Sequence, residues 1–208
     1  MTGRMSRIRL FVEDPLATGR VITLPREAAH YLVTVMRCST GDGIRLFNGR
    51  DGEWRGQLVD ARRGHARIEI GAQCRPQIEE KGPSLLFAPV KRARTDLIIE
   101  KATELGAARI LPVETARGIA ERVRLPRLEK IAREAAEQCG RLTLPVIDAP
   151  AALARVLADW PGDRPFLFCD TGGTAPPLAA ACRDLPAAWP PAVLVGPEGG
   201  FTEAERRL

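Results

Sequence analysis

The chain has 208 residues, which is enough for one large domain or two small ones with a sizeable core. Its formal net charge of +5 lies entirely in the first third: residues 1–75 hold 13 Arg, no Lys and 8 acidic residues, whereas residues 76–208 hold 18 basic and 18 acidic residues. A basic module beside a neutral one predicts a domain that docks on a polyanion, most commonly nucleic acid. A solvated arginine-rich surface is the alternative interpretation.

The cysteines and the hydropathy pattern argue against other classes of protein. Five widely spaced cysteines without a C-x-x-C pair disfavour a zinc site and favour a reducing compartment. The sequence predicts neither a signal peptide nor a membrane span. We therefore expect a cytoplasmic protein that holds no metal and contacts no membrane.

The first 72 residues predict a small β barrel. Short strands follow one another with turns about every ten residues, and Asn48-Gly49 is a strong hairpin signal. A helical stretch with a loose period begins at Pro25 and runs to Met36. The expected strands are Ile8–Val12, Val21–Leu24, Ile44–Phe47, Trp54–Val59 and Ala66–Ile70.

A linker is expected at residues 73–84, because this segment has low hydrophobicity and separates the basic region from the neutral one. Residues 85–208 then predict an α/β domain. It begins with strand Leu85–Val90 and a helix for which Thr95 is a plausible N-cap.

That first helix ends at Gly106, in the usual C-terminal position, and strand Ile110–Val113 follows directly. A strand, a helix and a strand in so short a segment form a βαβ unit, which implies a parallel sheet.

The alternation of strands and helices continues along the chain. A second helix runs from near Pro126 to Gly140, with an apolar stripe made of Leu128, Ile131, Ala132, Ala135 and Cys139. The complete order is β-α-β-α-β-α-β-α-β. A ligand should therefore lie beyond the carboxyl ends of the strands, at residues 170–174 and 196–201.

The stretch Val193–Phe201, V-L-V-G-P-E-G-G-F, joins a buried strand to a helix start marked by Thr202-x-x-Glu205. Glycines let a backbone approach a ligand closely, and the N–H groups of a helix start can donate to it. The spacing matches neither G-x-G-x-x-G nor G-x-x-x-x-G-K-[ST], so it does not indicate phosphate binding. On spacing alone, an ordinary strand-to-helix turn is as compatible as a ligand loop.

Four motifs occur in order along nearly the whole chain. They are H-Y-L-V-T-V-M-R with G-D-G-I-R-L-F-N-G, K-R-A-R-T-D-L-I-I-E-K-A-T-E-L-G, A-A-E-Q-C-G-R-L-T-L-P, and L-V-G-P-E-G-G-F-T. With this set the chain resembles the RsmE-type 16S ribosomal RNA uridine N3-methyltransferases of the SPOUT class.

The resemblance implies a PUA-like RNA-binding β barrel followed by an α/β domain with a parallel sheet and a trefoil knot. It also implies S-adenosylmethionine as cofactor, a homodimer, and 16S rRNA or the small ribosomal subunit as partner. The family continues past the glycine loop into another strand and a loop that threads the knot and closes the cofactor pocket. Because this chain stops at Leu208, we expect its methyltransferase domain to be C-terminally incomplete.

The resemblance also assigns residues to the cofactor, whereas the RNA contacts are inferred from the basic barrel and from the polar residues after the first strand and at the end of the second helix of the α/β domain. The backbone around the cofactor is expected to come from Leu194, Val195, Gly196, Gly199, Gly200 and Phe201. The residues expected to bind RNA are Arg37, Arg62, Arg63, Lys91, Arg92, Arg94 and Gln138.

Two residues are candidates for the chemistry, Arg141 and Glu198. Methyl transfer to N3 of uridine needs positioning and the removal of one proton, and the target base must be unpaired because N3 lies on its pairing edge. Arg141 could hold a phosphate or a uracil oxygen, or it could satisfy carbonyls at a helix end. Glu198, the acid of the glycine loop, could be the base or a hydrogen-bond acceptor for the cofactor.

Two other functions compete with this one. A non-catalytic RNA-binding or ribosome-assembly module would keep the basic barrel and tolerate changes in the glycine loop. A nucleotide-dependent oxidoreductase would need phosphate-binding glycines after the first strand of the second domain, where the chain has Lys91-Arg92-Ala93-Arg94 instead.

Overall fold

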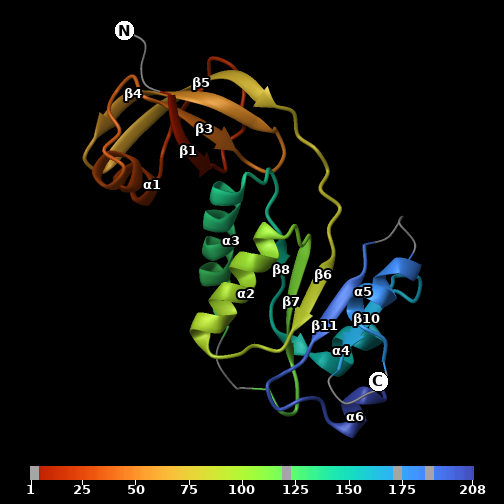
Figure 1. Ribbon diagram of the computed structural model, residues 1–208. Coiled ribbons are helices and arrows are strands. Elements are labelled where there is room, and N and C mark those ends of the chain that lie inside the picture. Colours follow the sequence, from red (N-terminus) through yellow and green to blue (C-terminus); the bar gives the residue numbers. More distant parts are fainter. Residues whose placement is uncertain (1–4, 119–122, 171–174, 186–189) are drawn as a thin grey trace. The chain divides into compact units, whose positions relative to one another are not determined.

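The computed structural model describes residues 5–118, 123–170, 175–185 and 190–208 (Figure 1). The chain divides into two compact units. The first consists of residues 1–79 with residues 136–143, and the second of residues 80–135 with residues 144–208.

The first unit is a five-stranded mixed sheet in the order β1-β3-β4-β5-β2. Its strands are β1 (Met5–Phe11), β2 (Val21–Thr23), β3 (Gly43–Phe47), β4 (Glu53–Arg62) and β5 (His65–Arg75). Strand β1 pairs parallel with β3, and the other pairs are antiparallel. The Asn48-Gly49 signal is confirmed, because β3 and β4 form a hairpin there and Gly49 has a φ of 80°.

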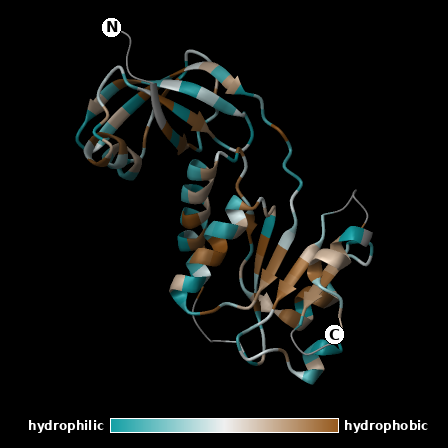
Figure 2. Cartoon of the chain, viewed as in Figure 1, coloured by the Kyte–Doolittle hydropathy of each residue, from teal (hydrophilic) through white to brown (hydrophobic). Residues whose placement is uncertain are grey.

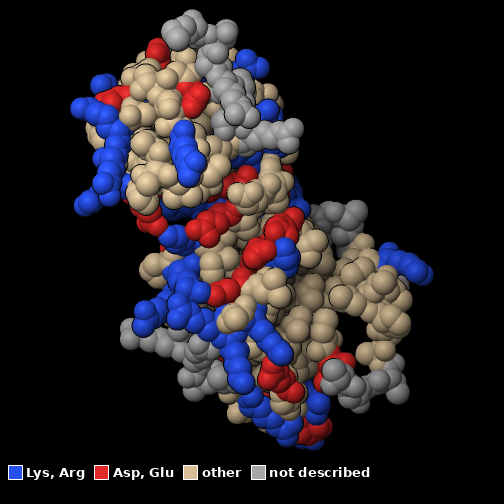
Figure 3. Space-filling model, turned by 60° about the vertical axis from the view of Figure 1, so that its left-hand side comes forward, with Lys and Arg blue, Asp and Glu red and all other residues tan. Residues whose placement is uncertain are grey.

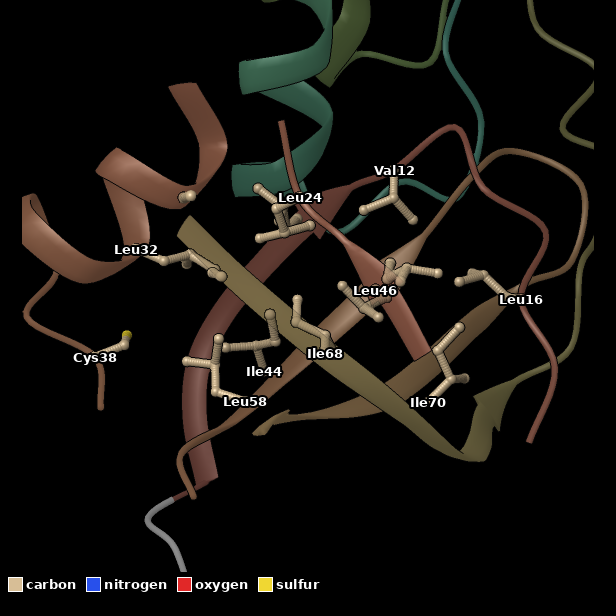
Figure 4. Packing of buried hydrophobic residues seen from close by; sticks show 14 residues of the cluster. Val12, Leu16, Leu24, Leu32, Cys38, Ile44, Leu46, Leu58, Ile68 and Ile70 are labelled. Carbon is tan, nitrogen blue, oxygen red and sulfur yellow. The ribbon is translucent and has the colours of Figure 1, made fainter. Parts of the chain in front are cut away.

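Alternating apolar residues of these strands form the core of the first unit. Figure 4 shows Ile44, Leu46, Leu58, Ile68 and Ile70 pointing toward one another, and all five are at most 1% exposed. The period of two places these side chains on the inner face of their strands, and in β3 Gly43 and Phe47 on the other face are buried as well.

The helical stretch after Pro25 consists of α1 (Arg26–His30) and a π-helix, η1 (Tyr31–Val35). The wider π-helical turn explains the loose period in the sequence, because its contacts do not recur at α-helical spacing. Arg37 follows with a φ of 55°, and it is the non-glycine residue with positive φ in the described part of the chain.

The second unit contains a parallel sheet in the order β10-β11-β6-β7-β8, with β9 also paired to β7. Its strands are β6 (Ser84–Phe87), β7 (Arg109–Glu114), β8 (Val146–Ile147), β9 (Ala151–Ala152), β10 (Phe166–Cys169) and β11 (Ala192–Val195). Its helices are α2 (Arg92–Glu104), α3 (Leu125–Cys139), α4 (Leu153–Ala158), α5 (Leu178–Ala181), η2 (Cys182–Asp184) and α6 (Glu203–Arg206). The last residues of α3, from Ala136 on, belong to the first unit. Figure 2 shows the central strands as mostly hydrophobic, as a sheet buried on both faces requires.

The strand order reverses between β6 and β11. From β6 the chain moves outward to β7 and β8, then crosses to β10 and returns to β11 beside β6. Ligands of open α/β sheets bind outside the carboxyl ends of the strands at such a reversal. The fold therefore predicts a ligand site at the segments that follow β6 and β11.

Two local expectations about the helices were wrong. Thr95 is not the N-cap of α2, because the helix begins at Arg92 after Lys91, and the Thr95 hydroxyl instead donates to Val90 O at 2.8 Å. Cys139 is exposed although it continues the apolar stripe of α3, and Ala135 is the last buried member of that stripe.

The expected end of α2 is confirmed: Gly106 follows the C-cap Leu105 with a φ of 87°. Within the described ranges, no helix is long and apolar enough to cross a membrane.

Candidate functional site

The glycine loop begins where β11 leaves the sheet, at Gly196. A Cβ at Gly196 would lie 2.3 Å from a ring carbon of Phe201, so only glycine fits there. Phe201 is 1% exposed and packs in the core of the second unit with Leu194, and its ring lies 4.7 Å from that of Phe168 in β10. The loop therefore folds back onto its own strand, and Phe201 anchors the returning chain.

A capping box starts α6 directly after this anchor. The Thr202 hydroxyl accepts a hydrogen bond from the N–H of Glu205, and the Glu205 carboxylate accepts one from the N–H of Thr202. The predicted Thr202-x-x-Glu205 signal is thus confirmed. Glu205 Oε1 also accepts from the N–H of Ala116 at 2.7 Å, which ties α6 to the segment after β7.

The same segment holds the glycine loop directly. Arg117 Nη1 donates to the carbonyl oxygen of Gly199 at 3.1 Å, and a Cβ on Gly199 would lie 3.3 Å from the Cβ of Arg117. Arg117 is 82 residues from Gly199 in the sequence, and Glu205 is 89 residues from Ala116. Neither of these two long-range contacts was expected from the sequence, and the T-A-R-G pattern after β7 was the signal that could have indicated a loop near a ligand.

Hydrogen bonds also set the pKa of Glu205. Burial raises the pKa of this carboxyl, but the hydrogen bonds from Thr202 and Ala116, together with the charge of Arg117, outweigh burial and hold the pKa below its usual value of 4.5. The ionised form is therefore the one that holds α6 and the segment after β7 together.

Glu198, at the tip of the loop, forms an ion pair with Arg94 of α2, with 2.8 Å between Arg94 Nη1 and Glu198 Oε1. Both side chains are largely exposed, at 72% for Arg94 and 53% for Glu198. The structure thus brings together one candidate RNA-binding residue and one candidate catalytic residue. An exposed pair of this kind contributes little to stability.

The other predicted ligand segment, residues 170–174, is only partly described. Asp170, which follows β10, forms an ion pair with Arg206 of α6 at 2.7 Å. Residues 171–174 lie outside the described residues.

A cavity of about 240 Å³ lies beside the first turn of α2. Its walls come from the segment after β6 and from the beginnings of α2 and α3, and three of its lining residues are arginines: Arg92, Arg124 and Arg127. Lys91, the N-cap of α2, directly precedes Arg92 in the sequence, and its side chain is exposed. Figure 3 shows Lys and Arg side chains gathered on the forward face of this unit.

The remaining predicted residues belong to the first unit. Arg141 is 8% exposed and its Nη2 donates to Thr143 Oγ1 at 3.1 Å, whereas Gln138 is exposed. Arg62 is exposed and donates from two nitrogens to Asp60, and Arg37 and Arg63 are exposed as well. The two catalytic candidates, Arg141 and Glu198, therefore lie in different units.

Comparison with known families defines the class of this protein. A family model described as an RNA methyltransferase domain matches residues 80–208, and one described as an RNA methyltransferase PUA domain matches residues 24–71. The chain belongs to the RNA methyltransferase family with an N-terminal PUA domain, which confirms the resemblance inferred from the four motifs.

Individual relatives share one name, ribosomal RNA small subunit methyltransferase E. The relative from Rickettsia conorii is 30% identical over 96% of this chain and 82% of its own length. The relative from Synechocystis sp. is 33% identical over 96% of this chain and 67% of its own length.

Solved structures agree with these relatives. The ribosomal RNA small subunit methyltransferase E of Neisseria gonorrhoeae, bound to S-adenosylmethionine, is similar with a TM-score of 0.83 at 25% identity, over 96% of this chain and 84% of that one. A putative methyltransferase of Legionella pneumophila, in complex with the same cofactor, gives a TM-score of 0.82 at 25% identity with the same coverage. The expected α/β parallel-sheet domain after a PUA-like unit is thereby confirmed.

Proposed function

We propose that this chain transfers a methyl group from S-adenosylmethionine to N3 of a uridine in 16S ribosomal RNA. The membership in the RNA methyltransferase family supports the reaction, and the shared name of the relatives supports the small ribosomal subunit as source of the substrate. The observation that carries the proposal is the glycine loop at the strand-order reversal, because that edge is where the fold binds ligands.

The residues of the loop fit this cofactor. Gly200 has a φ of 68°, and a Cβ there would meet no atom within 4 Å, so open space lies directly against the backbone. In the adjacent segment, Thr115 Oγ1 is buried without a hydrogen-bond partner within the described residues, and a bound polar group would satisfy it. When bound, S-adenosylmethionine supplies a methyl group activated by a positively charged sulfur.

The chain's own residues have three tasks in this reaction. The backbone of Gly196, Gly199 and Gly200, supported by Leu194, Val195 and Phe201, holds the cofactor. Basic side chains hold the RNA with the target uridine turned out of its stack, because N3 is inaccessible in a base pair. A base accepts the N3 proton as the new N–C bond forms, so that the nitrogen lone pair is free to attack in line.

Glu198 is the proposed base, and Arg94 orients it. The exposed carboxylate sits in the glycine loop and pairs with Arg94 at 2.8 Å. If Glu198 accepts the proton, Glu198→Gln lowers kcat by about 10²-fold or more while the KM for S-adenosylmethionine stays near its original value. If Glu198 only shapes the loop, Arg94→Ala and Glu198→Gln give equal losses, and the KM for the cofactor rises in both.

Arg141 is proposed to act on the RNA side, together with Gln138 from the same end of α3. The hydrogen bond from Arg141 to Thr143 orients the guanidinium. We further propose that the protein is a homodimer and that it works in the cytoplasm, where ribosomal subunits are assembled.

The test is a methylation assay with this chain, S-adenosylmethionine carrying a labelled methyl group, and either small ribosomal subunits or free 16S rRNA lacking the modification. Digestion of the product and mass spectrometry of the nucleosides should identify N3-methyluridine at one position. Methyl transfer to another atom, or to another RNA, would contradict the proposal. RNA binding without cofactor binding would favour the non-catalytic module instead.

A further inference from the structure

The cavity beside α2 has walls of two kinds. Val90, Val123 and Leu128 contribute aliphatic surface, and Arg92, Arg124 and Arg127 contribute guanidinium groups. Its volume of about 240 Å³ is larger than one water or ion requires. A ligand with an anionic part and a less polar part would complement both kinds of wall.

The charges of the cavity are not balanced. Asp96 is the acidic residue of the lining, and both of its oxygens are engaged by Arg127 through Nε, at 3.0 Å, and Nη2. Arg92 and Arg124 are exposed at the rim, and neither has an acidic partner in the described part of the chain. Two guanidinium groups are therefore available to an anion, while the third is fixed in place by Asp96.

The cavity adjoins the proposed methyl-transfer site. Pro89 and Val90 follow β6, which pairs with β11, the strand that leads into the glycine loop. The first turn of α2 contributes Arg92 to the cavity and Arg94 to the ion pair with Glu198. A strand of RNA held in the cavity would thus run past the loop that carries Glu198.

We propose that this cavity binds a phosphate group of the RNA strand that carries the target nucleotide. Arg92 and Arg124 bind the phosphate oxygens, and the ribose beside that phosphate packs on Val90, Val123 and Leu128. The inference rests on the proposed function, because it takes RNA as the substrate. It goes further in naming Arg124 and the ion-paired Arg127 as part of a defined phosphate site.

The test compares two double variants of the full chain. Arg92→Ala with Arg124→Ala removes the two free guanidinium groups of the cavity. Arg155→Ala with Arg183→Ala removes the same charge from exposed positions elsewhere in the second unit. Arg127 is left unchanged because its loss would leave Asp96 without its partner.

Affinity for a short single-stranded RNA of mixed sequence is measured by fluorescence anisotropy at several salt concentrations. The cavity variant should bind about tenfold more weakly, and the slope of log K against log salt should flatten by about 0.7 for each phosphate that the variant no longer neutralises. In the control variant, both the RNA affinity and the slope should change less than in the cavity variant. Equal affinity and equal slope in the two variants would overturn the proposal.

Two further measurements test whether the cavity binds RNA rather than the cofactor or a free nucleotide. Calorimetry should give the same affinity for S-adenosylmethionine in both variants, and a loss confined to the cavity variant would overturn the assignment to RNA. Uridine monophosphate should not bind at millimolar concentration, and binding that depends on Arg92 and Arg124 would identify a free nucleotide as the ligand. A wild-type chain that binds RNA through the cavity but transfers no methyl group would contradict the proposed function and leave this site intact.

Discussion

The three glycines of the glycine loop are favoured for two different physical reasons. Gly196 has the ring of Phe201 where a Cβ would be, and Gly199 lies against the Cβ of Arg117. Gly200 has open space beside it but a φ of 68°, which is unfavourable for any residue with a Cβ. Close approach of a side chain of the chain itself applies at Gly196 and Gly199, whereas positive φ applies at Gly200.

Gly196→Ala should weaken both the fold of the loop and its binding of S-adenosylmethionine. The added methyl group would displace Phe201 from the core, an overpacking that costs about 1–3 kcal/mol. Calorimetry should show reduced affinity for the cofactor, and thermal unfolding should show a lower Tm.

Gly162→Ala is the matched control, since a Cβ there meets no atom within 4 Å. If the wild type and Gly196→Ala bind S-adenosylmethionine with equal affinity, the glycine loop is not part of the cofactor site.

At the scale of elements, side chains from one segment fix the ends of another. The carboxylate of Glu205 starts α6 and also binds the segment after β7. In the first unit, Arg9 of β1 closes the carboxyl end of α3, where it donates to the carbonyl oxygens of Ala136 at 2.6 Å and Arg141 at 2.7 Å. A cation is favourable at this end of a helix, because the last carbonyls carry partial negative charge.

The contribution of Glu205 should depend on pH. Its pKa is lower in the folded chain than the ordinary 4.5, so the stabilisation is fully present above that value and is lost as the pH falls through the folded pKa. At neutral pH, Glu205→Gln should lose about 1 kcal/mol of cap stabilisation, a fall in Tm of about 2–4 °C. The difference from wild type should shrink as the pH drops below about 4.5.

Glu203→Gln serves as the control on the same helix, since the Glu203 side chain is 69% exposed. A Tm difference between wild type and Glu205→Gln that stays constant down to acid pH would show that the carboxylate charge is not what matters.

Arg9→Ala should strongly destabilise the first unit. Arg9 Nε lies 2.6 Å from Glu53 Oε1, and the Glu53 side chain is fully buried. Removing Arg9 leaves a buried carboxylate without its main partner and frees the carbonyls at the end of α3, with an expected loss of about 3–5 kcal/mol in urea unfolding.

Two other variants test whether the loss in Arg9→Ala comes from the buried charge of Glu53. Arg45→Ala should cost much less, because Arg45 is 47% exposed and lies 3.3 Å from Glu53. The double variant Arg9→Met with Glu53→Leu should lose less free energy of unfolding than Arg9→Ala alone, since no charge is left buried. A double variant as unstable as the single one would mean that the carbonyl contacts, rather than the charge pair, dominate.

At the scale of the whole molecule, the charge distribution separates two tasks. The first 75 residues hold the whole charge excess, and the residues that follow are neutral on balance. We expect the basic unit to supply RNA affinity that does not depend on sequence, in addition to the phosphate contact proposed for the cavity of the second unit. Binding to RNA should therefore weaken steeply as salt rises.

Replacing Arg62 and Arg63 together with Ala should flatten the dependence of log K on log salt by up to about two units. Arg62 is engaged by Asp60, so an effect at the upper end of that range requires the RNA phosphate to displace Asp60 from the guanidinium. Anisotropy titrations across a salt series measure the slope, and an unchanged slope would mean that neither arginine contacts phosphate.

The sequence alone determined the local structure of this protein. The period of the apolar residues indicated most strands of both sheets but not β9, the Gly106 signal gave the end of α2, and Thr202-x-x-Glu205 gave the start of α6. These features depend on residues a few positions apart, so spacing and turn chemistry suffice to predict them. The resemblance of four ordered motifs added the family.

Only the tertiary structure decided which distant residues meet. Arg94 contacts Glu198 across 104 residues, Arg117 contacts Gly199 across 82, and Arg9 contacts Ala136 across 127. No local period encodes such pairs, because they depend on which strands lie side by side and on where each strand ends. The strand-order reversal between β6 and β11 places the beginning of α2 beside the glycine loop, and so sets which arginines adjoin the proposed methyl-transfer site.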